Sequence, residues 1–480
     1  MKLQRIINGQ LTTFAVILSS VANSSASAQV QLDTSLIAKG TTGSQPTVSE
    51  DDKLVASDGS SSERFGDSAA ISGTTAIVGA PGGILFDLGI TTGVIYLYDT
   101  TTGIESFKLI ASDARDLDLF GASVAIAGTT AVVGAPQTDQ GIAEFDPGFV
   151  YIFDTTTGQE LFRLMASDAG DGDEFGAAVA ISGSTIIVGA PGHLGNGSVS
   201  GAVYLFDATS GQQLAKYTAL AAGSNDRFGA SVAISGSTIL VGAPGRVEAG
   251  SNTGAAYFID TINGQQIKVT AFDGSAGDEF GISVAMTDTT AIIGASGNDV
   301  AAFDGGSVYL FDTNTQQAVD PFRIIPADVG QFDQFGASVT IEGTTAIIGS
   351  PMDSQLAGSA YAYNISTGEQ IQKLIPADNE VGDEFGKSVA MSGATIIAGA
   401  PANDGNGPFS RTGAAYVYSI SEIGPCPADL NGDGALNFFD VSAFLQLFGA
   451  HDPEADFTND GIFNFFDVSA FLQAFSAGCP

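Results

Sequence analysis

Short apolar runs separated by small polar turns follow one another along most of the chain. An alternating run at 175–181 precedes a Ser-Gly-Ser turn and a β-branched run, Thr185–Ala190, which Pro191 ends. Two further runs follow at 201–207 and 212–220. Alternating or β-branched runs of this length between turn residues predict β-strands. The segment therefore predicts four antiparallel strands, named A, B, C and D in chain order.

This unit is repeated seven times. A Phe-Gly pair opens each copy, at Phe65, Phe120, Phe175, Phe228, Phe280, Phe335 and Phe385. A glycine follows fourteen residues after each phenylalanine, at Gly79, Gly134, Gly189, Gly242, Gly294, Gly349 and Gly399. Strand C carries a tyrosine in every copy, at Tyr96, Tyr151, Tyr204, Tyr257, Tyr309, Tyr361 and Tyr416. Four short strands per repeat predict an all-β fold, a seven-bladed β-propeller over residues 51–422.

The two ends of the repeat region predict how the ring closes. The last copy stops after strand C, near Ile420, and lacks a strand D. The segment 53–58 resembles the strand D segment 108–113 but precedes the first Phe-Gly pair. We therefore expect 53–58 to form the outer strand of blade seven. An open array would leave both ends unpaired and prone to edge-to-edge association.

Charged residues also follow the repeat. Each predicted strand D starts with a basic residue, Lys53, Lys108, Arg163, Lys216, Lys268, Arg323 or Lys373, which we interpret as protection of the sheet edge rather than a binding ring. The residue two before each Phe is acidic: Glu63, Asp118, Asp173, Asp226, Asp278, Asp333 or Asp383. These acids either form weak cation sites or a partner-binding rim, or hydrogen-bond their own turns. The regular repetition favours the turns.

The repeat resembles the FG-GAP repeat family, which forms the propeller of integrin α-chain heads and of many exported bacterial proteins. The resemblance covers about residues 51–420 and implies a seven-bladed propeller that binds partners through the loops of one face. Those are the D-to-A and B-to-C loops. Calcium-binding members carry an Asp/Asn-rich loop before the Gly-Ala-Pro strand. Here that place holds only short turns such as Ser72-Gly73-Thr74, so no calcium is expected there.

Composition and motifs argue against several functions. The formal net charge of −37 disfavours nucleic-acid binding and favours cations, although a solvated acidic surface also explains it. The sequence has no H-E-x-x-H, G-x-S-x-G or P-loop motif, so we expect no enzyme. A pair of aspartates meeting on the loop face, as glycosidases require, stays an alternative. His193 and His451 are isolated and are expected on the surface.

The N-terminus predicts export. Lys2 and Arg5 precede an apolar core at 11–22, and Ala26-Ser27-Ala28 fits a cleavage site, so residues 1–28 are expected to be a signal peptide cleaved near Ala28. No later stretch reaches 18 apolar residues, so no transmembrane anchor is expected. Residues 29–50 are expected to be a flexible leader. The mature protein is expected to be secreted or cell-surface.

The segment 423–480 predicts a small α-helical domain of paired EF-hand-like loops. Each twelve-residue loop offers oxygen ligands at positions 1, 3, 5, 7, 9 and 12, a pattern that predicts two Ca²⁺ sites. The ligands are Asp429, Asn431, Asp433, Ala435, Asn437 and Asp440 in the first loop, and Asp456, Thr458, Asp460, Ile462, Asn464 and Asp467 in the second. Thr458 is a weaker ligand than Asn431, so the second site should bind less tightly. Each loop runs into an amphipathic helix start.

This tail, about 424–480, resembles a type I dockerin of the variety bracketed by cysteines. The resemblance implies calcium-dependent folding and docking to a cohesin-like or cell-surface protein. Dockerins commonly place polar recognition residues where this chain has Phe438-Phe439 and Phe465-Phe466, so these phenylalanines are either core residues or an apolar docking patch. In an exported chain Cys426 and Cys479 most simply form a disulfide, the alternative being free thiols or a covalent attachment point.

Together these features predict an exported, non-catalytic adhesion or scaffold protein. The propeller face is expected to bind a protein or glycan, and the tail to mediate docking or surface attachment. The alternative is a carbohydrate-active enzyme or glycan-binding subunit of a dockerin-assembled extracellular complex.

Overall fold

The chain divides into two compact units, Pro46–Gly424 and a second one that includes Pro425–Pro480. The computed structural model describes residues 47–59, 62–82, 92–115, 118–137, 147–195, 198–248, 251–404, 411–420, 428, 430, 436, 438–458 and 461–477. The predicted signal peptide and most of the predicted leader lie outside these ranges.

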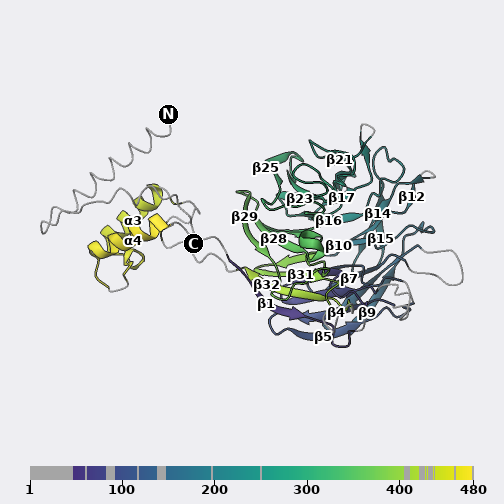
Figure 1. The fold of residues 1–480 in the computed structure, drawn as a ribbon, viewed down its shortest axis with the longest axis horizontal. Coiled ribbons are helices and arrows are strands. Elements are labelled where there is room, and N and C mark those ends of the chain that lie inside the picture. The colour runs from purple at the N-terminus through teal and green to yellow at the C-terminus, as the bar shows by residue number, and fades with distance from the viewer. Residues whose placement is uncertain are drawn as a thin grey trace. The chain divides into compact units, whose positions relative to one another are not determined.

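The first unit consists of seven four-stranded antiparallel sheets, as the sequence predicted (Figure 1). Blade 1 contains β2 (Ser68–Ser72), β3 (Thr75–Ala80), β4 (Val94–Asp99) and β5 (Ile104–Leu109); blade 2 contains β6 (Ser123–Ala127), β7 (Thr130–Ala135), β8 (Phe149–Asp154) and β9 (Gln159–Leu164). Blade 3 contains β10 (Ala178–Ser182), β11 (Thr185–Ala190), β14 (Ala202–Asp207) and β15 (Gln213–Tyr217); blade 4 contains β16 (Ser231–Ser235), β17 (Thr238–Ala243), β20 (Ala255–Asp260) and β21 (Gln266–Val269).

The remaining blades follow the same order. Blade 5 contains β22 (Val284–Met286), β23 (Thr290–Ala295), β24 (Ser307–Asp312) and β25 (Ala318–Ile324); blade 6 contains β26 (Ser338–Glu342), β27 (Thr345–Ser350), β28 (Ser359–Asn364) and β29 (Glu369–Leu374). Blade 7 contains β30 (Val389–Ser392), β31 (Thr395–Ala400), β32 (Ala414–Ile420) and β1 (Val48–Leu54). Between strands B and C lie the hairpins β12 (Leu194–Gly195) with β13 (Ser198–Val199) and β18 (Val247–Glu248) with β19 (Ser251–Asn252), and the single turn α2 (Asp353–Leu356). The A strands contact one another in a closed circle, from β2 through β30 and back to β2.

The N-terminal strand closes the ring, as predicted, but with different bounds. β1 pairs with β32 and places Val48 opposite Ile420 and Lys53 opposite Tyr416. The strand therefore covers Val48–Leu54 rather than 53–58, and three of its residues belong to the segment assigned to the leader. The side chain of Gln372 in blade 6 bonds both the N–H and the carbonyl of Val48, which ties the closing strand to the neighbouring blade.

The bounds of two other strand types also differ from the sequence prediction. Strand A begins three or four residues after the phenylalanine, at Ala178 in blade 3, because the Phe-Gly pair contacts the preceding blade instead. The basic residue of strand D is its second-to-last residue rather than its first, as Lys108 in β5 shows. Strand B of blade 3 has the predicted bounds, Thr185–Ala190.

The Phe-Gly and Gly-Ala-Pro motifs meet between blades. A Cβ atom on Gly79, at the end of strand B in blade 1, would overlap the carbonyl oxygen of Gly121, which belongs to the Phe-Gly pair of blade 2. The same overlap would occur in all seven junctions, including Gly399 of blade 7 against Gly66 of blade 1. Ser68 also donates a hydrogen bond to the Gly121 carbonyl, over 2.7 Å. Only glycine permits two backbones to approach this closely.

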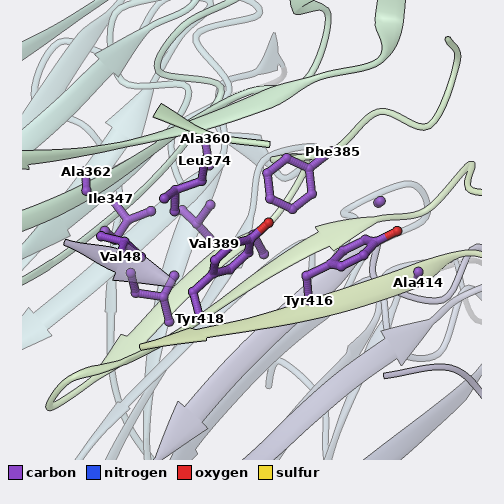
Figure 2. Packing of buried hydrophobic residues seen from close by; sticks show 13 residues of the cluster. Val48, Ile347, Ala360, Ala362, Leu374, Phe385, Val389, Ala414, Tyr416 and Tyr418 are labelled. Atoms are coloured by element: carbon purple, nitrogen blue, oxygen red, sulfur yellow. The ribbon is translucent and has the colours of Figure 1, made fainter. Parts of the chain in front are cut away.

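Phenylalanine and tyrosine fill the space between the blades in this tryptophan-free chain. Phe385 lies 5.6 Å from Tyr416 and 6.1 Å from Tyr418 between ring centroids. Figure 2 shows this cluster, to which Val48 of the closing strand and Leu374 of blade 6 both belong. Burial of each such aromatic side chain stabilises the fold by about 2–3 kcal/mol.

The second unit contains two helices, α3 (Phe438–Ala450) and α4 (Phe465–Ala477), and the 3₁₀ helix η3 (Pro453–Ala455). Phe444 and Phe471, which occupy equivalent positions in α3 and α4, stack at 4.1 Å between ring centroids. Around them lie Val441, Ala455 and Phe457. The two helices therefore pack through a shared aromatic core, which agrees with the predicted small helical domain in its coarse features. Within the described residues, no helix has the length and apolarity needed to cross a bilayer.

The interblade contact predicts unequal effects of two glycine substitutions in blade 4. Gly242→Ala places a methyl group against the backbone of Gly281 in blade 5, whereas Gly236→Ala only forces a left-handed φ of 56° in an open turn. We expect the first variant to lower the free energy of unfolding by about 3 kcal/mol and the second by about 1 kcal/mol. Urea denaturation measures both. Equal losses would contradict the proposed role of the glycine contact.

Candidate functional site

The B-to-C loops and the D-to-A loops lie together on one face of the propeller, here named the loop face. The backbone N–H of Phe335, at the end of a D-to-A loop, donates to the carbonyl of Gly305, at the end of a B-to-C loop, over 2.9 Å. Phe385 bonds Ala357 in the same way at the next junction. Within the described residues, the D-to-A and B-to-C loops therefore share one face, as predicted.

The acidic residues that precede the Phe-Gly pairs are buried under this surface. Asp173 accepts a hydrogen bond from the N–H of Gly170 over 2.8 Å, and Asp278 accepts one from Ser275 over 2.9 Å. Equivalent bonds to a residue three positions earlier occur at Asp118, Asp226, Asp333 and Asp383. The interpretation that these aspartates stabilise their own turns is confirmed. Burial raises the pKa of Asp278 and of Asp333, despite these hydrogen bonds.

A second set of aspartates, which sequence analysis missed, links each blade to the next. Asp378 accepts a hydrogen bond from the hydroxyl of Tyr416 over 2.8 Å and forms an ion pair with Lys53 over 2.6 Å. The aspartate lies seven residues before a Phe-Gly phenylalanine, and the tyrosine and the cation come from strands C and D of the following blade. The other sets are Asp58–Tyr96–Lys108, Asp113–Tyr151–Arg163, Asp168–Tyr204–Lys216, Asp273–Tyr309–Arg323 and Asp328–Tyr361–Lys373.

These contacts shift the pKa of individual groups in the polar layer under the loops. The hydrogen bond from Lys108 lowers the pKa of Asp58, against the opposing effect of burial. Burial, followed by the hydrogen bond to Asp378, raises the pKa of Tyr416, so its hydroxyl stays a donor. Because the ion pairs are partly exposed, each contributes only about 0–1 kcal/mol. The seven basic residues, interpreted from sequence as edge protection, thus all have carboxylate partners within the described residues.

Blade 4 departs from this arrangement. Ala221 occupies the position of the missing aspartate, and the buried hydroxyl of Tyr257 has no hydrogen-bond partner. Arg246 instead bonds Asp226 over 2.7 Å and the carbonyl of Ala221 over 2.6 Å, while Lys268 pairs with Glu248. Burial raises the pKa of Tyr257 to about 12.

His193, predicted on the surface, is buried in blade 3. Its Nδ1 lies 2.9 Å from Asp173, and its Nε2 lies 2.7 Å from the ammonium group of Lys216. Lysine can only donate, so Nε2 accepts and the proton resides on Nδ1, where it is donated to Asp173. The prediction was wrong because the loop that carries His193 folds back over strands C and D. The result is an Asp–His pair enclosed beneath the loops.

Apolar side chains, by contrast, are exposed on the loop face. Ten large ones on these loops are more than a third exposed: Leu194, Leu220, Val247, Phe272, Val300, Phe303, Phe332, Met352, Leu356 and Val381. On the opposite face, the turn that carries Ile262 is the clearest exposed apolar site among the described residues, with Ile262 82% exposed. A rigid ring with apolar loops on one face is suited to binding a partner.

The tail brings together several of the predicted calcium ligands of the second loop. The hydroxyl of Thr458 lies 2.8 Å from Asp467 and 3.4 Å from Asp456, so loop positions 1, 3 and 12 converge. Gly461 has a φ of 73° and donates its N–H to Asp456 over 2.7 Å, as the sharp turn at position 6 of such a loop requires. Burial acts to raise the pKa of Asp467, but hydrogen bonds from Asn464 and Thr458 lower it.

The remaining ligands are divided between described and undescribed positions. Asp440 is buried in the first turn of α3, and the carbonyl of Ile462 accepts a hydrogen bond from the Asn464 side chain. The other predicted positions lie outside the described residues: Asp429, Asn431, Asp433, Ala435, Asn437 and Asp460, together with Cys426 and Cys479 of the predicted disulfide. Within the described ranges, no group of three or more His, Cys, Asp or Glu side chains is arranged to hold a metal.

The phenylalanine pairs of the tail are exposed. Phe438 and Phe439 are 54% and 67% exposed, and Phe465 and Phe466 are 60% and 69% exposed. The interpretation of these residues as core is therefore wrong, because the pairs precede the buried face of each helix, which begins at Asp440 and Asp467. His451 is exposed, as predicted, and its ring lies 5.2 Å from that of Phe463.

The unpartnered hydroxyl in blade 4 predicts that two identical substitutions have opposite effects. Tyr257→Phe removes a buried group that has no partner, so we expect the free energy of unfolding to stay unchanged or rise by up to about 1 kcal/mol. Tyr309→Phe removes a 2.8 Å hydrogen bond to Asp273, and we expect a loss of about 1–2 kcal/mol. Thermal and urea denaturation check both. A clear loss in Tyr257→Phe would show that its hydroxyl is satisfied after all.

Comparison with known proteins agrees with this architecture. A family model described as FG-GAP repeat matches residues 48–98, 105–153, 159–206, 212–259, 264–311, 320–363 and 369–418. Each of these seven stretches runs from strand D of one blade through strand C of the next. No curated protein matches the chain significantly. The matched stretches cover most of the chain and contain the glycine contacts and the Asp–Tyr–cation sets described above. The chain therefore belongs to the FG-GAP repeat family.

Proposed function

We propose that this chain is an exported, non-catalytic adhesion or scaffold protein. The propeller binds a protein or glycan partner through the loop face, and the tail docks the protein to a cohesin-like or cell-surface partner. One observation carries the proposal: apolar side chains are exposed on the loop face, whereas the carboxylates beneath them are bonded within and between blades. The surface is therefore equipped for contact rather than for proton transfer.

The polar groups that resemble catalytic residues support the non-catalytic assignment. The Asp173–His193 pair is enclosed, and the second nitrogen of the ring already accepts from Lys216. Asp328 and Asp378 are partly exposed but are paired with lysines of strand D. A glycosidase needs one carboxyl group free to donate a proton and a second free to attack or activate water. The paired aspartates of the loop face do not meet that requirement.

The spacing of oxygen ligands in the tail supports two calcium sites, and the described residues of the second loop add to this support. In the second loop Asp456, Thr458 and Asp467 converge, and the carbonyl of Ile462 lies at position 7, so these residues would hold one ion together with Asp460 and Asn464. Asp440 at the start of α3 would close the first site with Asp429, Asn431, Asp433, Ala435 and Asn437. Bound calcium would neutralise the clustered carboxylates and fix each loop against its helix. A Cys426–Cys479 disulfide would join the two ends of this unit.

The exposed phenylalanine pairs support an attachment role for the tail. Both lie directly before the buried carboxylate of position 12, at equivalent places in α3 and α4. Calcium at these loops would order the helix starts that display the pairs. Attachment should then depend on calcium, and the apolar pairs would contact the docking partner where dockerins use polar residues.

Binding without turnover is the expected result for the loop face. The wild-type chain, presented to a glycan panel and to envelope proteins of the source organism, should retain a partner and leave glycans intact. The double variant Leu220→Ser, Leu356→Ser should weaken retention at least tenfold, because it removes two exposed apolar contacts of the loop face. Ile262→Ser on the opposite face is the matched control. Glycan hydrolysis that disappears when a loop-face aspartate is changed would establish the enzyme instead.

Calcium titration tests the tail separately. Calorimetry on the full chain should give two sites, with tighter binding at the first loop. Asp440→Asn and Asp467→Asn should each remove one site, because each withdraws the carboxylate expected to bind the ion through both oxygens. Asp171→Asn, in an exposed acidic D-to-A loop, should leave both sites intact. Helical circular dichroism should fall with chelator in the wild type. If neither the heat nor the ellipticity depends on calcium, the metal assignment is wrong.

A further inference from the structure

One turn of the loop face contains a residue that its backbone conformation disfavours. The position three residues before the Phe-Gly phenylalanine has a positive φ in all six described copies. Gly172, Gly277 and Gly382 occupy it in three of them, and Asn225 and Ser62 in two others. In the loop between blades 5 and 6 it is Phe332, with a φ of 66°. A bulky side chain in this region costs stability, and such outliers are retained where they serve a function.

The side chain of Phe332 does not contribute to the core. It is 53% exposed and lies 5.2 Å from the ring of Phe303, which is also 53% exposed, with an edge-to-face angle of 76° between the rings. Phe303 belongs to the B-to-C loop of blade 5. The pair therefore joins the two loop types at one point of the loop face and places two aromatic rings together at the surface.

Backbone hydrogen bonds hold this pair in place. The N–H of Phe332 donates to the carbonyl of Phe303 over 2.8 Å, and Gln334 donates to the carbonyl of Asp304 over 3.2 Å. Asp304 donates its own N–H to the carboxylate of Asp299 over 2.7 Å. A site fixed before its partner arrives loses less conformational entropy on binding.

The charges around the pair favour a cation. Asp304 follows Phe303 directly, and Asp299 is exposed in the same loop. Neither segment, 296–306 nor 325–337, contains a Lys, Arg or His. Within the described residues, no cation lies over the ring of Phe303 or Phe332, although six other aromatic rings each have one.

Those six rings show how the fold itself binds a cation. Arg323 lies over the ring of Phe272, 5.8 Å from its centroid, and is paired with Asp273. Lys373 lies 5.1 Å from the ring centroid of Tyr361 and is paired with Asp328. Each internal site thus combines an aromatic ring with a carboxylate, an arrangement that attracts guanidinium and ammonium groups. The Phe303–Phe332 pair offers two aromatic rings in loops that also carry Asp304 and Asp299, without a cation from the described chain over either ring.

We propose that Phe303 and Phe332 anchor a protein partner that presents an arginine or lysine beside an apolar side chain. The cation meets Asp299, Asp304 and the aromatic rings, and the apolar side chain covers the exposed ring edges. The proposal rests on the binding role of the loop face and names the chemistry of its partner. A protein partner fits better than a glycan because the site offers negative charge and aromatic surface together.

The test selects a phage-displayed library of random twelve-residue peptides against the full chain in 0.15 M NaCl. The selected peptides are then compared on the wild type and on Phe332→Gly. We expect peptides that carry Arg or Lys next to an apolar residue to lose at least tenfold in affinity on Phe332→Gly and on Phe303→Ser. Ile262→Ser, which removes an exposed apolar side chain of the opposite face, should leave their affinity unchanged.

Stability separates loss of binding from loss of folding. Phe332→Gly and Phe332→Asn introduce residues that other copies have at this turn. The unfolding temperature of these variants should therefore be the same as that of the wild type or about 2 °C higher. If no selected peptide depends on Phe332, if the dependent peptides are acidic or uncharged, or if only glycans of a parallel panel show the dependence, the proposal is overturned.

The same experiment distinguishes this site from the wider proposal. Peptides that bind Phe332→Gly normally but lose affinity on the variant Leu220→Ser, Leu356→Ser would leave the loop-face function intact and overturn only the aromatic site. Peptides and glycans that are insensitive to every loop-face variant would overturn both.

Discussion

The closed ring depends on the contact between two glycines at each blade junction. Gly66 donates its N–H to the carbonyl of Gly79 within blade 1, so the two motif glycines face each other across one A–B hairpin. The carbonyl of the next Phe-Gly glycine, Gly121, then packs where a side chain of Gly79 would lie. The hairpin sets the distance between the two motif halves, and the junction demands that both be glycine. This explains why the spacing within a repeat is constant while the loops vary.

Above these junctions, a layer of buried polar groups supports the loops. The aspartates of the D-to-A loops bond their own turns, and the Asp–Tyr–cation sets tie each loop to the next blade. In the described part of these loops the bonds fix the backbone, so the proposed partner would meet loops that are already ordered. The conformational entropy of these loops is lost on folding rather than on binding, which favours affinity. The same bonds occupy the carboxylates of these two sets, so their position in the loops is explained by support of the fold.

Features that recur in every copy of the repeat could be predicted from the sequence, whereas features that depend on contacts with other parts of the fold could not. Blade number and ring closure follow from the Phe-Gly spacing and from the missing last strand. The bounds of β1 did not follow, because Val48 and Leu54 are its only fully buried residues and its middle is polar. The aspartates seven residues before six of the seven phenylalanines were visible as a pattern, but their partners come from another blade. His193 was misplaced because its burial arises from strands distant in sequence, and the phenylalanine pairs because their exposure depends on where each helix begins.

Departures from the repeat differ in whether the surrounding chain compensates for them. Ala221 replaces the aspartate of blade 4, and there Arg246 forms ion pairs with Asp226 and Glu248 instead. In blade 3 the buried ring of His193 has Asp173 and Lys216 as hydrogen-bond partners. Phe332 has no such compensation: the positive φ remains, and half of the ring faces solvent beside Phe303. Most copies of the repeat make the same contacts at each position. Where one copy differs and other residues of the fold replace the lost contacts, packing explains the difference. A departure that leaves strain and exposed aromatic surface is not explained by packing, which is why the proposed binding site lies at this junction rather than at the buried histidine.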